Sequence, residues 1–66
     1  MQEELEVLKG YVESLKLHEK STITMGDLSD LRTSLRGADE FGLADYVERL
    51  GTPEELQDLI VNTLYG

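Results

Sequence analysis

Residues 50–56 read Leu-Gly-Thr-Pro-Glu-Glu-Leu, and this stretch carries the strongest local signal in the chain. Gly51 is the residue type that commonly ends a helix, because it adopts a left-handed conformation without steric cost. Thr52 is a preferred N-cap, Pro53 suits the first helical position, and Glu55 occupies the place of the reciprocal capping residue. The stretch therefore predicts the end of one helix and the start of the next.

The segments on both sides of this junction have helical periodicity. Residues 53–64 are predicted as a helix whose apolar side carries Leu56, Leu59, Ile60, Thr63 and Leu64. Residues 39–50 are predicted as the preceding helix, with Asp39 as its cap. Its apolar side carries Phe41, Ala44, Val47 and Leu50, with Leu43 and Tyr46 beside them.

A third helix is predicted over residues 26–36, with Leu28, Leu31 and Leu35 facing inward. Thr24 followed three residues later by Asp27 resembles a capping box, although that motif usually has Glu or Gln at the second place. Asp27 also suits the positive end of the helix dipole. Gly37 is expected to supply the left-handed residue that ends this helix.

The first helix is predicted over residues 2–19. Its apolar residues recur at spacings of four and three, which is the pattern of a narrow packing seam: Met1, Leu5, Leu8, Val12 and Leu15. Such a seam packs either against the rest of its own domain or against a second copy of the chain. His18, near the end of this helix, is expected to complement the negative helix terminus.

The fold class predicted from these segments is all-α, with residues 1–66 forming one domain as a compact array or bundle of four short helices. A core of this size supplies only about 3–5 kcal/mol. The chain has no cysteine and one histidine, so neither a disulfide nor a usual zinc site supports it. Self-association or a bound partner remains as support, and we expect a homodimer through Leu5, Leu8, Val12 and Leu15.

Acidic residues outnumber basic ones by 14 to 6, which gives a formal net charge of −8. This charge repels phosphate backbones and anionic membranes and favours partners with a basic surface. Solubility alone also explains such a charge. The cysteine-free composition and the acidic start of the sequence favour a cytoplasmic protein without a leader, and no apolar run approaches the length of a membrane span.

No catalytic, cofactor or metal site emerges from the pattern, and we expect no enzyme activity and no cofactor. His18 has no nucleophile or orienting carboxylate at a motif spacing. The run from Asp27 to Arg32 begins like a calcium loop but lacks the glycine at its sixth position and the glutamate at its twelfth. The chain also lacks a glycine-rich phosphate loop.

Residues 27–50 have the size and turn glycine of a helix-turn-helix, although their second helix is acidic where a DNA-binding helix is basic. That interpretation needs Arg32 and Arg36 to face the duplex. Residues 41–50 are similar to a helix of sterile alpha motif domains that carries Gly-Leu and then Tyr. This resemblance covers ten residues, and the tryptophan usual in that family's first helix is absent, so no function is carried across.

The leading hypothesis is a small acidic protein that binds another protein as an adaptor or inhibitor-type regulator, of the kind that phages and plasmids encode. A nucleic-acid mimic is one version of it. The predicted contact face consists of Asp39, Glu40, Asp45 and Glu48, with Tyr46 at its edge. The alternatives are a dimerisation or docking module through the first helix and a helix-turn-helix DNA binder.

Overall fold

The computed structural model describes residues 2–66, with side chains from Glu3 onward. This part of the chain is all-α, as predicted, and forms a small helical array. Its elements in chain order are α1 (Gln2–Ser14), a 3₁₀ turn (Leu17–Glu19), α2 (Met25–Gly37), α3 (Phe41–Leu50), α4 (Pro53–Leu59) and a wider π-type turn (Ile60–Leu64).

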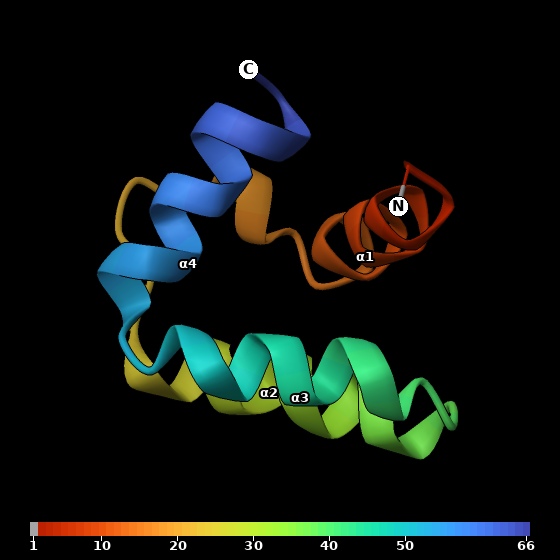
Figure 1. Cartoon of the computed structure of the whole chain (residues 1–66). Coiled ribbons are helices and arrows are strands. Elements are labelled where there is room, and N and C mark those ends of the chain that lie inside the picture. The colour runs from red at the N-terminus through yellow and green to blue at the C-terminus, as the bar shows by residue number, and fades with distance from the viewer. Residues whose placement is uncertain (1) are drawn as a thin grey trace.

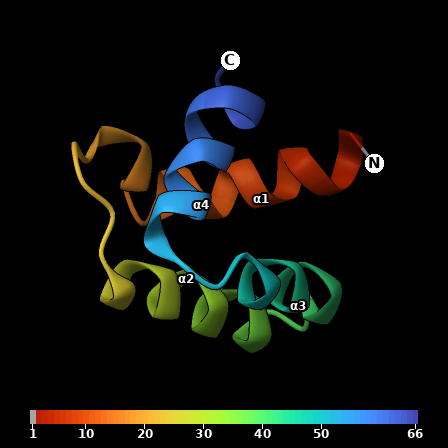
Figure 2. The ribbon, with the colours of Figure 1, turned by 60° about the vertical axis from the view of Figure 1, so that its left-hand side comes forward.

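Two layers make up the array (Figures 1 and 2). The helices α2 and α3 lie side by side and antiparallel in one layer, and α1 crosses over them in the other. After the end of α3, α4 leaves the layer of α2 and α3 and ends beside α1 (Figure 2). The core lies between the layers, and its fully buried large side chains are Leu8, Val12, Leu31, Leu35, Val47 and Leu56.

The first helix ends earlier than predicted. It stops at Ser14 rather than near residue 19, and Lys16 adopts a left-handed conformation with φ 59°. Leu17 follows Leu8 by nine residues, about two and a half helical turns, so a continuous helix would place these leucines on opposite sides. The break instead turns Leu17 into the core, where 3 % of its surface stays exposed. Burial of that side chain offsets the backbone strain at Lys16.

The start of α2 confirms the predicted cap at Thr24. Its hydroxyl accepts the backbone N–H of Asp27 at 3.2 Å, and the Asp27 carboxylate accepts the backbone N–H of Thr24 at 2.9 Å. Asp27 is also the buried charged residue of the described chain, and Lys20 donates to it at 2.7 Å. These hydrogen bonds, that from Lys20 above all, lower the pKa of Asp27 below its usual 3.8, although burial opposes them.

The junction between α2 and α3 differs from the prediction. Gly37 is the last residue of α2, and the left-handed conformation falls on Asp39, with φ 61°. Aspartate tolerates this conformation better than most residues do. Glu40, rather than Asp39, therefore precedes α3, and it makes no side-chain cap. Its backbone N–H bonds instead to the Leu35 carbonyl at 2.8 Å, which closes the turn.

The junction between α3 and α4 forms largely as predicted. Gly51 has φ 78°, and the Thr52 hydroxyl accepts the Glu55 backbone N–H at 3.3 Å. The last helix does not continue to Leu64 as a regular α-helix. A wider turn follows Leu59, closed by a 3.0 Å bond from the Tyr65 N–H to the Ile60 carbonyl, and Thr63 on it is exposed rather than apolar-facing.

Candidate interaction surfaces

The apolar seam of α1 packs within its own domain. Leu8 and Val12 are fully buried, and Leu5 and Leu15 are half-buried against the same core. Met1, the first residue of the predicted seam, lies outside the described residues. A dimer held by Leu8 and Val12 would require the core to open. In this fold the seam therefore packs against the rest of its own chain. Of the seam residues, Leu5 and Leu15 keep part of their surface accessible to solvent.

The predicted acidic face is divided around α3. Tyr46 and Glu48 are two residues apart and therefore point in directions about 160° apart. Glu48 lies on the side of α2, where its carboxylate pairs with Arg32 at 3.3 Å and with Arg36 at 3.6 Å. Tyr46 lies on the side of α1. Tyr46 and Glu48 thus lie on different flanks of α3, and the partner-binding role of the predicted set stays a prediction.

The face of α3 that points to solvent combines an aromatic ring with carboxylates. Phe41, Asp45 and Glu48 follow one another at helical spacings of four and three, so they share this side. Phe41 is 57 % exposed, contrary to its predicted place in the core. Asp39 and Glu40 stand at the N-terminal end of the same helix. We call these five residues the outer face of α3.

The exposure of Phe41 has a geometric reason. Leu43, Ala44 and Val47 already form a complete buried stripe on this short helix. Phe41 precedes Leu43 by two residues, more than half a helical turn, so it cannot share the centre of that stripe. The sequence contained this signal, because the stripe beginning at Leu43 competes with the one beginning at Phe41.

The negative potential of the outer face comes mainly from its less paired carboxylates. Glu48 is compensated by two arginines. Asp39 and Asp45 are exposed and form no ion pair among the described residues. Glu40 is half-buried. Of the predicted acidic residues, Asp45 is therefore the one that lies within α3, is exposed and forms no ion pair among the described residues.

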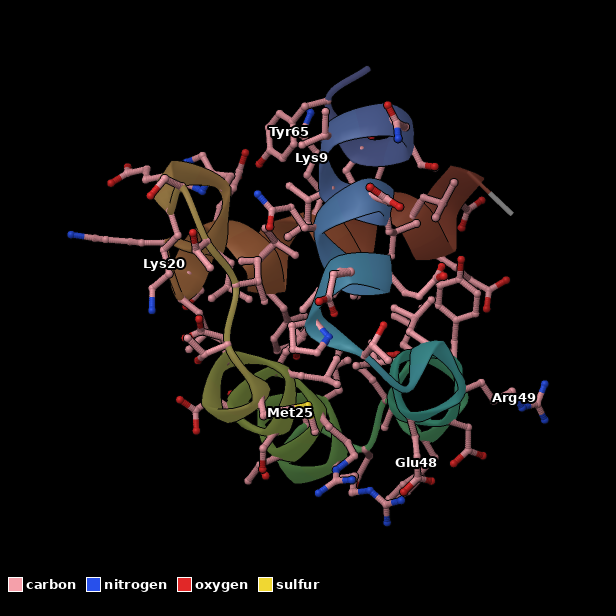
Figure 3. All side chains as sticks on the ribbon, turned by 90° about the vertical axis from the view of Figure 1, so that its left-hand side faces the viewer. Lys9, Lys20, Met25, Glu48, Arg49 and Tyr65 are labelled. Atoms are coloured by element: carbon pink, nitrogen blue, oxygen red, sulfur yellow. The ribbon has the colours of Figure 1, made fainter. Side chains whose placement is uncertain are left out.

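A second feature of α3 is a hollow on the adjacent flank, which faces α1. It has a volume of about 260 Å³ and is lined by Glu4, Leu5, Gly42, Leu43, Tyr46 and Arg49. This is slightly below the usual range of small-molecule sites, about 300–1,000 Å³, and is closer to the space that one large side chain fills. Tyr46 is 41 % exposed there. Figure 3 shows Arg49 extending from α3 away from the body of the molecule.

The end of the chain is fastened to α1 by Tyr65. Lys9 lies 4.7 Å from the centre of its ring (Figure 3). The Tyr65 hydroxyl donates to Glu13 at 2.7 Å, and the His18 ring stacks on the Tyr65 ring with 5.6 Å between the ring centres. Loss of solvent around the hydroxyl, together with the Glu13 carboxylate, raises the pKa of Tyr65 to about 12. His18 thus lies in the 3₁₀ turn and packs on the Tyr65 ring, whereas the sequence placed it near the end of a longer first helix.

Within residues 2–66, no three acidic or histidine side chains gather as a metal site would require. The run that begins like a calcium loop is part of α2, where Asp27 is held by Lys20. None of the described helices is both long and apolar enough to cross a membrane. No protein family, curated protein or solved structure matches this chain.

Proposed function

We propose that this chain is a small, non-enzymatic, cytoplasmic protein that binds another protein, as an adaptor or an inhibitor-type regulator. Its outer face of α3 meets a basic surface on the partner. The observation that carries the proposal is the exposure of Phe41, 57 % open to solvent and one helical turn from the unpaired Asp45. Aromatic side chains, Phe among them, are enriched in the buried cores of protein interfaces.

The two kinds of residue have separate physical roles. The Phe41 ring buries apolar area on contact, and buried aromatic anchors carry much of the energy of protein interfaces. The carboxylates act earlier, because charges at the rim of an interface steer the encounter and mainly raise the association rate. The formal charge of −8 adds a long-range attraction to a basic surface.

A nucleic-acid-binding protein is one possible kind of partner, in which case the carboxylates of the outer face would stand in for phosphates. DNA itself is a weaker candidate. A helix-turn-helix contact requires Arg32 and Arg36 to reach the duplex, and both of them pair with Glu48 on α3. Competition by a nucleic acid that exceeds competition by heparin, a polyanion that binds any basic surface, separates a phosphate-mimicking contact from an ordinary acidic one.

The experiment compares charge reversals of equal size at two places. The partner is captured from lysate with the native protein, and its association with purified variants is followed across a salt series. Asp45→Lys should slow association by about tenfold at low salt and flatten the salt dependence. Asp58→Lys changes the net charge equally on α4, away from the outer face, and should retain most of the native rate and its salt dependence.

Phe41→Ala tests the anchor on its own. We expect a faster dissociation, corresponding to about 2 kcal/mol of lost binding, with little change in association rate. Circular dichroism should show that both α3 variants remain folded. Equal effects of Asp45→Lys and Asp58→Lys, together with no effect of Phe41→Ala, would show that binding follows net charge and that the outer face is not the contact surface.

A further inference from the structure

The hollow between α1 and α3 carries opposite charges on its two walls. Glu4 stands on the α1 wall and Arg49 on the α3 wall, with Leu5 and Leu43 between them. Neither Glu4 nor Arg49 forms an ion pair among residues 3–66. Arg32 and Arg36, by contrast, are both held by Glu48. The hollow therefore joins an apolar floor, made by the half-buried Leu5 and the buried Leu43, to two charged groups that form no ion pair among residues 3–66.

We propose that a second copy of this chain covers the hollow, related to the first by a two-fold axis. In such a pair the same patch meets itself, so a residue on one wall faces a residue on the other wall of the second copy. Glu4 of each copy then pairs with Arg49 of the other. The two Tyr46 rings pack across the axis and cover the leucines. This surface lies on a different flank of α3 from the outer face, and the inference does not depend on the proposed function.

Charge complementarity selects a second copy over other occupants. A basic segment entering the hollow would meet Arg49, and an acidic one would meet Glu4 together with the overall charge of −8. A copy of the chain satisfies both walls at once, and the patch itself is neutral while most of the surface is acidic. Tyrosine and arginine are also the residue types enriched where interface energy concentrates.

The size of the molecule sets the expected strength of the dimer. A standard interface buries about 800 Å² on each partner, roughly a fifth of the 4248 Å² that this chain exposes. The net charge of the two copies opposes association. We therefore expect a weak dimer, with a dissociation constant of about 10 μM, which an area at the low end of the specific range allows.

A blocking substitution tests the surface without disturbing the monomer. A Cβ at Gly42 meets nothing within 4 Å, so Gly42→Gln projects a side chain into the hollow of a folded chain. Replacing a helical glycine also favours the helix. Gly10→Gln is the matched control, because a Cβ at this exposed α1 glycine likewise meets nothing within 4 Å and Gly10 does not line the hollow. Sedimentation equilibrium should show native and Gly10→Gln dimers and a Gly42→Gln monomer.

Charge exchange then tests the pairing itself, at about 0.15 M salt, where long-range repulsion is screened over about 8 Å. Glu4→Arg alone places two cations in facing positions, and Arg49→Glu alone places two anions there. Each variant should dimerise at least tenfold more weakly than the native chain. Mixing the two should restore association as a heterodimer, because each copy then faces its opposite charge. A pair within one chain would gain nothing from mixing.

The outcomes that overturn the proposal are distinct. A native chain that stays monomeric up to about 1 mM excludes the dimer. A Gly42→Gln variant that dimerises like the native protein moves the interface elsewhere. Two single charge variants that fail to associate when mixed exclude the reciprocal pairing of Glu4 with Arg49.

Discussion

Two sets of polar contacts link segments of this fold, and they differ in the separation along the chain of the residues that they join. At the start of α2, Asp27 joins Thr24 and Lys20, three and seven residues away. At the end of the chain, Tyr65 joins Glu13, which is 52 residues away. The first is complete within one segment of sequence. The second exists only after α1 and the last turn have come together, so it depends on the rest of the fold.

The two sets of contacts also differ in their exposure to water. The Asp27 side chain is 9 % exposed, whereas Tyr65 as a residue is 41 % exposed. Hydrogen bonds made away from water compete less with solvent, and a charged acceptor strengthens them. We therefore expect the cap of α2 to contribute more stability than the Tyr65 contact.

The largest effect is expected from Asp27→Ala. The substitution removes the bonds to the Thr24 N–H and to Lys20, and it should lower the free energy of unfolding by about 2 kcal/mol. For a domain of this size that corresponds to a fall in melting temperature of about 10 °C. Asp30→Ala, an exposed position on the same helix, should change stability by less than about 0.5 kcal/mol. Equal losses for the two variants would mean that the cap contributes nothing beyond helix charge.

This contrast also explains how much of the architecture the sequence could predict. The helix starts at Thr24 and Thr52 and the end at Gly51 depend on neighbouring residues, and all three form as expected. The break at Lys16 depends on where Leu17 can reach the core. Local periodicity contains no information on that, because it treats each segment as if it packed alone.

The candidate surfaces show the same contrast between features that depend on neighbouring residues and features that depend on how distant segments pack. The sequence indicated an acidic α3 with Tyr46 at the edge of its carboxylates, but it placed the exposed Phe41 in the core. Tyr46 and Glu48 also lie on different flanks of the helix. The place of Glu48 is set by Arg32 and Arg36 on α2, up to 16 residues away. Which carboxylate is neutralised therefore depends on how α2 and α3 pack, and α3 alone cannot reveal it.

A second effect of the α2 cap should appear in acid. Because the folded state lowers the pKa of Asp27 below 3.8, the stability from its ionised form is present above that pH and is lost as the pH falls through the folded value. Asp27→Asn removes the titration and keeps the shape. The difference in unfolding free energy between native and Asp27→Asn proteins should be constant from pH 5 to 7 and shrink below about pH 3.8. Urea titrations at each pH measure it, and a constant difference down to pH 2 would assign the stability to packing.

The smallest effect is expected from Tyr65→Phe, which removes the hydroxyl bonded to Glu13 and leaves the ring that His18 and Lys9 contact. The loss of stability at pH 7 should be well below that of Asp27→Ala, because the contact is open to water. Its sign with pH is opposite to that of the α2 cap. The folded state raises the pKa of Tyr65 to about 12, so the contribution is complete below the unfolded value near 10 and is lost as the pH rises through about 12.

Tyr46→Phe is the matched control, since Tyr46 is equally exposed and its hydroxyl makes no hydrogen bond within the described chain. Urea unfolding at pH 7, 9 and 11, at concentrations too low for self-association, should show a difference between the native and Tyr65→Phe proteins that narrows at pH 11. An equal change in unfolding free energy for the two phenylalanine variants would show that the Tyr65–Glu13 hydrogen bond does not stabilise the folded chain.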